Sequence, residues 1–192
     1  MLSEHAQHKT RGRSLDRIEE LRAQVSRLQQ ELQAEKRAHF NRRVSFGDLV
    51  TDRWQNAKEY GFGEGTSCYD NVLIRDDVKV GRYTWIGPSV VLDGQGGLEI
   101  GDYCSISAGV QIYTHHMVRW SVQLGAARSD VAPTRIGNGV FIGPNSVVQM
   151  GVVIGDRAVI GAMSFVNRNI PAGAKAWGCP ARVVGTSDEY LR

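Results

Sequence analysis

The sequence is short of cysteine and proline and contains no long apolar run, and each shortage excludes a class of protein. Its three cysteines, Cys68, Cys104 and Cys179, are odd in number and show no C-x-x-C spacing, which argues against a disulfide framework or a zinc knuckle and favours a reducing compartment. No stretch approaches the roughly 18 consecutive apolar residues of a membrane span. The first residues, MLSEHAQHKTRGRS, lack the apolar centre of a signal peptide, so we expect a cytoplasmic protein.

Neither sign of charge is in large excess, since the net charge is only +3 over 192 residues. Basic residues form no stripe with interleaved aromatic side chains, so nothing in the sequence indicates binding to nucleic acid. Glycine, in contrast, is abundant: 22 Gly stand against 5 Pro, while 42% of the residues are hydrophobic. A chain of this length and hydrophobic content can bury a core, which predicts one domain, with or without an appendage.

The first region of the chain has the pattern of an amphipathic helix. We expect residues 1–13 to be disordered and residues 14–40 to form a helix of the coiled-coil type. In this helix, apolar residues alternate spacings of three and four among Glu, Gln and Arg: Ile18, Leu21, Val25, Leu28 and Leu32. About three heptads is short, so two interpretations stay open: a coil that joins several copies of the chain, which we favour, or a surface helix packed on its own chain.

Residues 41–71 are predicted to form a junction that is partly helical and partly irregular. The stretch SFGD can act as a capping box, from Ser45 to Asp48, ahead of a short helix. The apolar residues of that helix are Leu49, Val50, Trp54 and Ala57. The glycines of GFGEGTS then predict irregular chain. At the other end of the protein, residues 186–192 are expected to be a tail.

From Val72 onward, aliphatic residues recur at intervals of six, a period that neither a helix nor a single strand explains. These positions are Ile74, Val80, Ile86, Leu92, Ile100, Ile106, Ile112, Ile136, Ile142, Val148, Ile154, Ile160 and Val166. Two interruptions separate the runs: two residues inserted around DGQGG at 93–97, and an excursion between Ile112 and Thr134. A constant period of this kind indicates a repeat architecture.

A second series of mostly small or medium residues stands two positions before these aliphatic residues, from Val72 to Ser164. Because alternate side chains of a strand point to the same side, both series can face inward, and a turn after each pair closes a coil of stacked rungs. Glycine often follows the aliphatic residue, as at Gly81 and Gly143, and we expect it to let the chain bend where a side chain would crowd.

The repeat resembles the left-handed parallel β-helix of the hexapeptide-repeat acyltransferase superfamily, in which three hexads make one triangular coil. The resemblance covers residues 72–185 and implies a mainly β fold with an active-site loop at 113–133. Two further stretches, GVQIYTHHM and NRNIPAGAKAWGCPARVVG, resemble the galactoside, maltose and streptogramin acetyltransferase group and the sugar O-acetyltransferases of surface polysaccharide synthesis. The resemblance implies a homotrimer that uses acetyl-CoA as the acyl donor and no metal.

Acyl transfer from a thioester to a hydroxyl requires a base near the operating pH, and imidazole supplies one. Of the five histidines, only His115 and His116 lie within the predicted β-helix, at the point where the chain leaves it for the excursion. The resemblance places the general base here, and we favour His115 over His116. A metal enzyme on this scaffold needs three His ligands, and the β-helix offers only these two.

The resemblance also implies where acetyl-CoA binds: along the groove between two neighbouring prisms of a trimer, held largely by backbone groups. The positions that match the family's coenzyme residues are Pro144, Ala162, Asn167, Arg168 and Arg182. Of these, Arg168 and Arg182 would meet the phosphates of the nucleotide end.

The excursion and the inserted residues supply candidates for the acceptor site. Aromatic faces beside hydrogen-bonding groups suit a sugar ring. The candidates are Tyr113, Arg119, Trp120, Arg128 and Asp93. Asp93 is expected to orient either the acceptor or the catalytic histidine.

The sequence therefore predicts an enzyme that moves an acetyl group from acetyl-CoA to a hydroxyl of a sugar or sugar-containing acceptor by direct transfer. Two alternatives stay open: transfer to an amine of an amino sugar or an antibiotic, and a non-catalytic trimeric scaffold. An amine acceptor is the nearer alternative, because an amine that is already partly neutral needs less help from a base.

Overall fold

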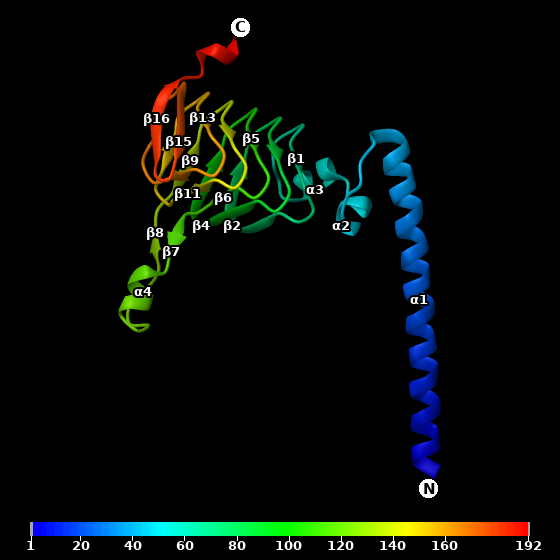
Figure 1. Ribbon diagram of the computed structural model, residues 1–192. Helices are drawn as coiled ribbons and strands as arrows, with labels where there is room; N and C mark the ends of the chain where they lie inside the picture. Colours follow the sequence, from blue (N-terminus) through cyan, green and yellow to red (C-terminus); the bar gives the residue numbers. More distant parts are fainter. Residues whose placement is uncertain (1, 192) are drawn as a thin grey trace. The chain divides into compact units, whose positions relative to one another are not determined.

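The structure is a computed structural model that describes residues 2–191, with the side chains of residues 15–191 (Figure 1). The chain divides into two compact units, Met1–Val50 and Thr51–Arg192. Among the described residues, no helix combines the length and the apolar character that a membrane crossing requires.

The first unit contains a long helix and a short one. Helix α1 (Leu2–Phe40) begins at residue 2 of the chain and not at residue 14. The segment that we expected to be disordered contains several good helix formers and no proline, so it can continue the helix. Helix α2 (Phe46–Val50) follows a short turn. The Ser45 Oγ accepts a hydrogen bond from the Asp48 N at 3.4 Å, which is the first half of the predicted capping box.

The apolar series of α1 lies along one side of the helix and is only half covered. The exposed fractions are 42% for Ile18, 49% for Leu21, 48% for Val25 and 45% for Leu28. Within its own unit, the helix therefore presents an apolar stripe that no other described segment of that unit buries.

The second unit begins with helix α3 (Arg53–Glu59). The Asp52 side chain caps it by accepting hydrogen bonds from the Trp54 N at 2.9 Å and the Gln55 N at 2.8 Å. Because Asp52 starts a new helix, the single short helix predicted for this region is two helices, α2 and α3.

A parallel β-solenoid of about six turns makes up most of the second unit. One of its sides, here the first face, is a sheet with the order β1-β3-β5-β10-β13-β15-β16. Its strands are β1 (Ser67–Cys68), β3 (Trp85–Ile86), β5 (Ser105–Ile106), β10 (Phe141–Ile142), β13 (Val159–Ile160), β15 (Ala174–Gly178) and β16 (Ala181–Thr186). All pair in parallel except β15 and β16, which form a C-terminal antiparallel hairpin.

The second sheet supplies the other two faces, because its long strand β4 (Val91–Ile100) turns a corner. Its residues 91–92 pair with β6 and its residues 98–100 pair with β9. Strand β2 (Leu73–Val80) runs parallel to β4 along both faces. The second face also holds β6 (Gln111–Ile112), β11 (Val147–Val148) and β14 (Phe165–Val166). The third face also holds β9 (Thr134–Ile136) and β12 (Val153–Ile154). The corners that follow the first, second and third faces are called the first, second and third corners below.

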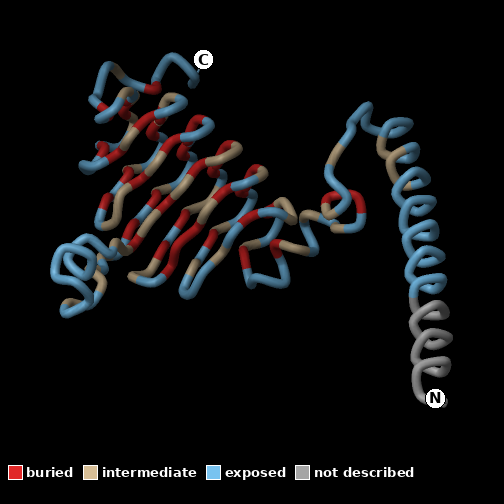
Figure 2. The backbone as a smooth tube through the Cα atoms, turned by 60° about the horizontal axis from the view of Figure 1, so that its bottom comes forward, coloured by how far each residue is buried: buried red, intermediate tan, exposed pale blue. Residues whose placement is uncertain are grey.

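The aliphatic series of the repeat fills the interior of the solenoid, as predicted. In Figure 2 the buried residues form rows along the stacked coils. On the first face, the parallel register places Ile86, Ile106, Ile142 and Ile160 one above another, and each side chain is 0% exposed. Pairing starts at Ser67, earlier than the predicted start of the β-helix, because the Ser67–Cys68 strand already pairs with β3.

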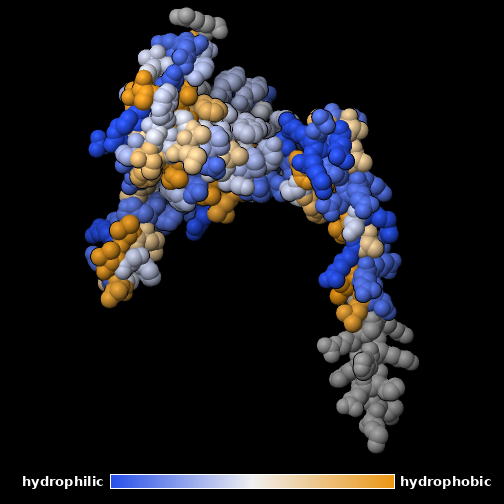
Figure 3. Space-filling model, viewed as in Figure 1, coloured by the Kyte–Doolittle hydropathy of each residue, from blue (hydrophilic) through white to orange (hydrophobic). Residues whose placement is uncertain are grey.

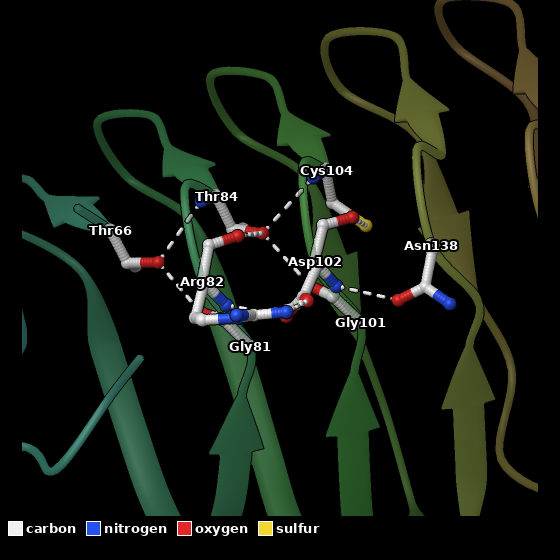
Figure 4. Close-up of polar contacts among 8 residues, drawn as sticks. All are labelled: Thr66, Gly81, Arg82, Thr84, Gly101, Asp102, Cys104 and Asn138. Atoms are coloured by element: carbon white, nitrogen blue, oxygen red, sulfur yellow. Dashed lines mark hydrogen bonds and ion pairs between the residues drawn. The ribbon is translucent and has the colours of Figure 1, made fainter. Parts of the chain in front are cut away.

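Polar members of the second series connect successive coils from inside (Figure 4). The Thr84 N donates to the Thr66 Oγ1 at 3.0 Å, and the Thr84 Oγ1 donates to the Gly101 O at 2.9 Å. The same hydroxyl accepts from the Cys104 N at 3.0 Å. A small hydroxyl side chain in this series therefore satisfies backbone groups that the turn leaves unpaired.

The third corner carries a second ladder, on the outside. The Asp102 Oδ1 accepts from the Arg82 N at 2.7 Å, the Asn138 Oδ1 from the Asp102 N at 2.9 Å, and the Asp156 Oδ1 from the Asn138 N at 2.7 Å. Figure 4 shows the first two of these contacts, with the Arg82 guanidinium lying along the Asp102 carboxylate. Each coil thus binds the turn of the coil below through one side chain.

The glycines that follow many of the aliphatic residues stand where a side chain would crowd the next coil, as predicted. At Gly143, an added Cβ would lie 2.5 Å from the Ala162 N and 2.8 Å from the Gly161 C of the next coil. The left-handed bend itself falls two residues later, at Asn145, whose φ is 57°. The predicted crowding is therefore confirmed at Gly143, whereas the bend itself lies at Asn145.

The excursion leaves the stack of coils at the second corner. It consists of β7 (His115–His116), helix α4 (Val118–Val122) and β8 (Asp130–Val131), and Figure 1 shows α4 outside the stacked strands. After β16, a short 3₁₀ helix, η1 (Asp188–Leu191), ends the described chain within the predicted tail.

Candidate active site

Both candidate histidines lie on β7, which pairs antiparallel with β8 in a two-stranded ribbon. His115 stands opposite Val131, and His116 stands opposite Asp130. Successive side chains of a strand point to opposite sides, so the ribbon sends the two imidazoles in different directions. The ribbon therefore gives these neighbouring residues different environments.

His115 is held by the carboxylate of Asp93. The His115 Nδ1 lies 2.7 Å from the Asp93 Oδ2, and the exposed fractions of the two side chains are 15% and 1%. A carboxylate can only accept a hydrogen bond, so the neutral imidazole carries its proton on Nδ1. The Nε2 lone pair is then available to accept a proton from another molecule.

Asp93 is an anion in spite of its burial. Burial acts to raise the pKa of this carboxyl group and is the largest influence on it. Hydrogen bonds from His115, from the Thr114 N at 2.8 Å and from the Thr114 hydroxyl at 2.9 Å act in the opposite direction, and together they hold the pKa below its usual value. A negative charge is therefore present beneath the imidazole at neutral pH.

His116 has no comparable partner. Its Nδ1 lies 3.6 Å from the Asp130 Oδ2, which is too long for a hydrogen bond, and 35% of its side chain is exposed. The other oxygen of Asp130 pairs with the Arg119 Nη1 at 3.1 Å. Of the two candidate bases, only His115 is oriented by a buried carboxylate.

The predicted acceptor residues lie in two places. Tyr113 stays at the second corner, where its hydroxyl donates to the Gln111 Oε1 at 2.8 Å. Arg119 and Trp120 belong to α4, and the exposed fraction of Trp120 is 45%. Arg128 is also exposed. Asp93, in contrast, is buried against His115, a position that suits the second of its two predicted roles.

Apolar side chains gather at the tip of the excursion beside Trp120. Val122 is 77% exposed and Leu124 is 94% exposed. Figure 3 shows this hydrophobic surface over α4, at the lower left of the view. The excursion thus carries an uncovered apolar surface next to the ribbon that holds the two histidines.

The predicted coenzyme residues are exposed and lie on separate parts of the solenoid. Pro144 and Ala162 occupy the first corner in successive coils, where the Met163 N donates to the Pro144 O at 2.9 Å. Asn167 and Arg168 follow β14 at the second corner. Arg182 lies on β16, opposite Trp177. Within one chain these five residues do not form a single cluster.

Two groups beside the candidate base, the buried Thr114 and the half-buried Gly96, were not predicted from the sequence. Thr114 is 0% exposed and bonds to Asp93, and Gly96 donates its N–H to the Thr114 Oγ1 at 2.8 Å. The one available signal was the position of Thr114 directly before His115. Among the residues that the structure describes, no group of three or more His, Cys, Asp or Glu is arranged to hold a metal ion.

Residues 133–168 match the family model for the Bacterial transferase hexapeptide (six repeats). Galactoside O-acetyltransferase of Escherichia coli K12 is 33% identical over 109 residues, which cover 56% of this chain and 53% of that protein. WcaF of the same organism, provisionally named a colanic acid biosynthesis acetyltransferase, is 32% identical over 130 residues, covering 62% of this chain and 69% of WcaF.

Among solved structures, the hexapeptide-repeat containing acetyltransferase VCA0836 of Vibrio cholerae is similar with a TM-score of 0.64 and 27% identity. The similarity covers 88% of this chain and 92% of that chain. The stacked hexads and these similarities define the class of protein. The chain belongs to the hexapeptide-repeat transferase family, and it spans 53% of the length of galactoside O-acetyltransferase.

Proposed function

We propose that the protein is an acetyltransferase that moves an acetyl group from acetyl-CoA to a hydroxyl of a sugar or sugar-containing acceptor. The observation that carries this proposal is the pair formed by His115 and the buried Asp93 on a hexapeptide-repeat solenoid. The relatives described above support it, because they are named as acetyltransferases, and one of them is a galactoside O-acetyltransferase.

His115 is the general base in the proposed mechanism. Its Nε2 takes the proton of the acceptor hydroxyl as that oxygen attacks the carbonyl carbon of the thioester. The carbon–sulfur bond then breaks, the thiolate of coenzyme A leaves, and the imidazolium returns the proton to this sulfur. Asp93 holds the Nδ1–H form of the ring and stabilises the positive charge that the ring carries between the two proton transfers.

The residues for acetyl-CoA are those that the family resemblance implies. Pro144 and Ala162 offer small turn residues with backbone groups at the first corner, and the exposed guanidinium groups of Arg168 and Arg182 can reach phosphates. Because these residues lie on separate parts of one prism, we propose that each site is completed by a neighbouring chain. The proposed assembly is a homotrimer.

The acceptor side of the proposal rests on Tyr113, Arg119, Trp120 and Arg128. Trp120 offers an exposed aromatic face, and the two arginines offer donors to the hydroxyl groups of a saccharide. A hydroxyl must lose its proton during attack, so the buried carboxylate behind His115 favours an alcohol over an amine as acceptor. The three free thiols are compatible with a reducing compartment, and the cytoplasm is the proposed location.

The test compares His115→Ala with His116→Ala, which changes the adjacent histidine on the same strand. Release of the coenzyme A thiol is measured with a panel of sugars, nucleotide sugars, amino sugars and antibiotics. With the best acceptor, we expect His115→Ala to lower kcat about a hundredfold or more while the KM for acetyl-CoA stays nearly unchanged, and His116→Ala to cost less. Full activity in both variants would refute the proposed mechanism, and an absence of thiol release with every acceptor would favour the scaffold.

A further inference from the structure

We propose that Thr114 is a positioning residue of this site, and that the inserted loop 93–97 forms a support that orients His115. The catalytic part of this inference rests on the proposed function of His115. Neither Thr114 nor the loop would contact the substrate. Both act through the Asp93 carboxylate.

The first observation is the unequal use of the two Asp93 oxygens. The Oδ2 accepts from the His115 Nδ1, the Thr114 N and the Thr114 Oγ1, at 2.7, 2.8 and 2.9 Å. The Oδ1 is buried and has no hydrogen-bond partner in the structure. Two of the three groups within hydrogen-bonding distance of this oxygen, the N–H and the hydroxyl, therefore belong to Thr114.

The second observation concerns the single proton of the Thr114 hydroxyl. The Gly96 N donates to the Thr114 Oγ1 at 2.8 Å, so this oxygen already acts as an acceptor on one side. On its other side lie two acceptors of Asp93, the backbone O at 2.8 Å and the Oδ2 at 2.9 Å. The hydroxyl proton therefore points to Asp93 whichever of the two oxygens it meets.

The third observation is the tight packing of the inserted loop. An added Cβ on Gly94 would lie 2.5 Å from the Asp77 C in the preceding coil. An added Cβ on Gly96 would lie 2.5 Å from the Thr114 O and 3.0 Å from the Ala132 N. The loop thus fills the space between the coil below and the start of the excursion, and all three contacts are with backbone atoms that cannot rotate away.

Together these contacts make a chain of support from the prism to the imidazole. The preceding coil supports the loop, the Gly96 N–H orients the Thr114 hydroxyl, and Thr114 holds the carboxylate that selects the Nδ1–H form of His115. Thr114 and Asp93, the last two residues before the imidazole, are shielded from water, and unpaired polar groups are costly there. A change at Thr114 is therefore expected to alter the orientation and the tautomer of the base.

The test uses Thr114→Val, which keeps the branched shape and removes the hydroxyl, and Thr114→Ser, which keeps the hydroxyl. Thr84→Val is the matched control. Thr84 is 1% exposed, its hydroxyl donates to the Gly101 O and accepts from the Cys104 N, and it belongs to the third corner (Figure 4). Loss of an interior hydroxyl bridge is thus common to both valine variants, and only Thr114→Val loses a hydroxyl contact with Asp93.

Two quantities are measured in each variant: kcat with the best acceptor, and the NMR signal of the His115 Nδ1–H in protein with labelled histidine. We expect Thr114→Val to lower kcat about tenfold or more and to lose or broaden the Nδ1–H signal. Thr114→Ser and Thr84→Val should keep both the signal and kcat within about twofold of the wild type, although Thr84→Val lowers Tm.

The NMR signal does not depend on any acceptor, so it separates this inference from the proposed function. If no acceptor supports transfer, the inference survives when Thr114→Val alone loses the Nδ1–H signal. An unchanged signal in Thr114→Val, or no such signal in the wild type, would overturn it. A normal kcat in Thr114→Val, or a fall in kcat that Thr84→Val shares equally, would also overturn it.

Discussion

At the scale of single residues, two adjacent histidines differ in the carboxylate that lies beside each imidazole ring. His115 has a buried carboxylate 2.7 Å from its Nδ1, whereas the nearest carboxylate oxygen to His116 is 3.6 Å away. The orientation and the tautomer of an imidazole decide whether it can serve as a base. The hydrogen-bond partner of each ring therefore distinguishes the two histidines better than their positions in the sequence do. Asp93 is therefore as important to the proposed reaction as the histidine.

The pKa of Asp93 makes the stability of the fold depend on pH. Its folded pKa is lower than that of an unfolded aspartate, about 3.9, so its contribution to stability is present above that pH and is lost as the pH falls through the folded pKa. We expect Asp93→Asn to lower the free energy of unfolding by about 2 kcal/mol between pH 5 and 7. The difference from the wild type should shrink as the pH is lowered below about 4.

Thermal unfolding of both proteins across this pH range checks the prediction. Asp77→Asn is the control, because 68% of the Asp77 side chain is exposed and its nearest cation lies 3.8 Å away. A gap between wild type and Asp93→Asn that stays constant down to pH 3 would show that the lost stability does not come from the charge of Asp93.

The sequence could mark His115 as a candidate base but could not predict the whole of its surroundings. The hexad period and the resemblance marked the point where the excursion begins, and this point contains both histidines. For Asp93, the sequence left two roles open, orienting the acceptor or orienting the histidine. The repeat does not predict the path of the chain at the two inserted residues, so it does not place this carboxylate. The contacts of Thr114 with Asp93 and Gly96 depend on that path and were not predictable.

At the scale of elements, the six-residue period was enough to predict the register of strands only two residues long. Ile142 pairs with Ile106 below and Ile160 above, as the common phase requires. The period carries this information because a one-residue slip would turn the whole aliphatic series outward. The period does not reveal where each turn bends, so the bend was expected at the glycine, whereas after Gly143 it falls at Asn145.

The close stacking of turns leads to a prediction about glycine. Gly143→Ala would place a Cβ 2.5 Å from the Ala162 backbone N, so we expect a loss of about 1–3 kcal/mol of unfolding free energy. Gly185→Ala is the matched control, because its added Cβ would meet only the Lys175 Cε at 3.8 Å. Chemical denaturation of the two variants measures the difference, and an unchanged midpoint for Gly143→Ala would contradict the stacking argument.

At the scale of the whole molecule, two surfaces of the chain have apolar character and lack cover within their own units. One is the stripe of α1 that includes Leu21 and Val25, and the other is the tip of the excursion with Val122 and Leu124. Such surfaces are typical of contacts between chains. A short heptad series does not determine the number of chains, so the sequence predicted a trimer only through the family resemblance.

The proposed trimer predicts that two defective chains can restore one working site. If each site takes His115 from one chain and Arg182 from its neighbour, then trimers that mix His115→Ala with Arg182→Glu chains contain some sites with both wild-type residues. Sedimentation equilibrium of the wild type should give three times the mass of the chain. At acetyl-CoA concentrations well below its KM, co-expressed mixed trimers should be several-fold more active than either variant alone. Mixed trimers that only match the average of the two variants would place the site within one chain, and a stable, fully active monomer would refute the assembly.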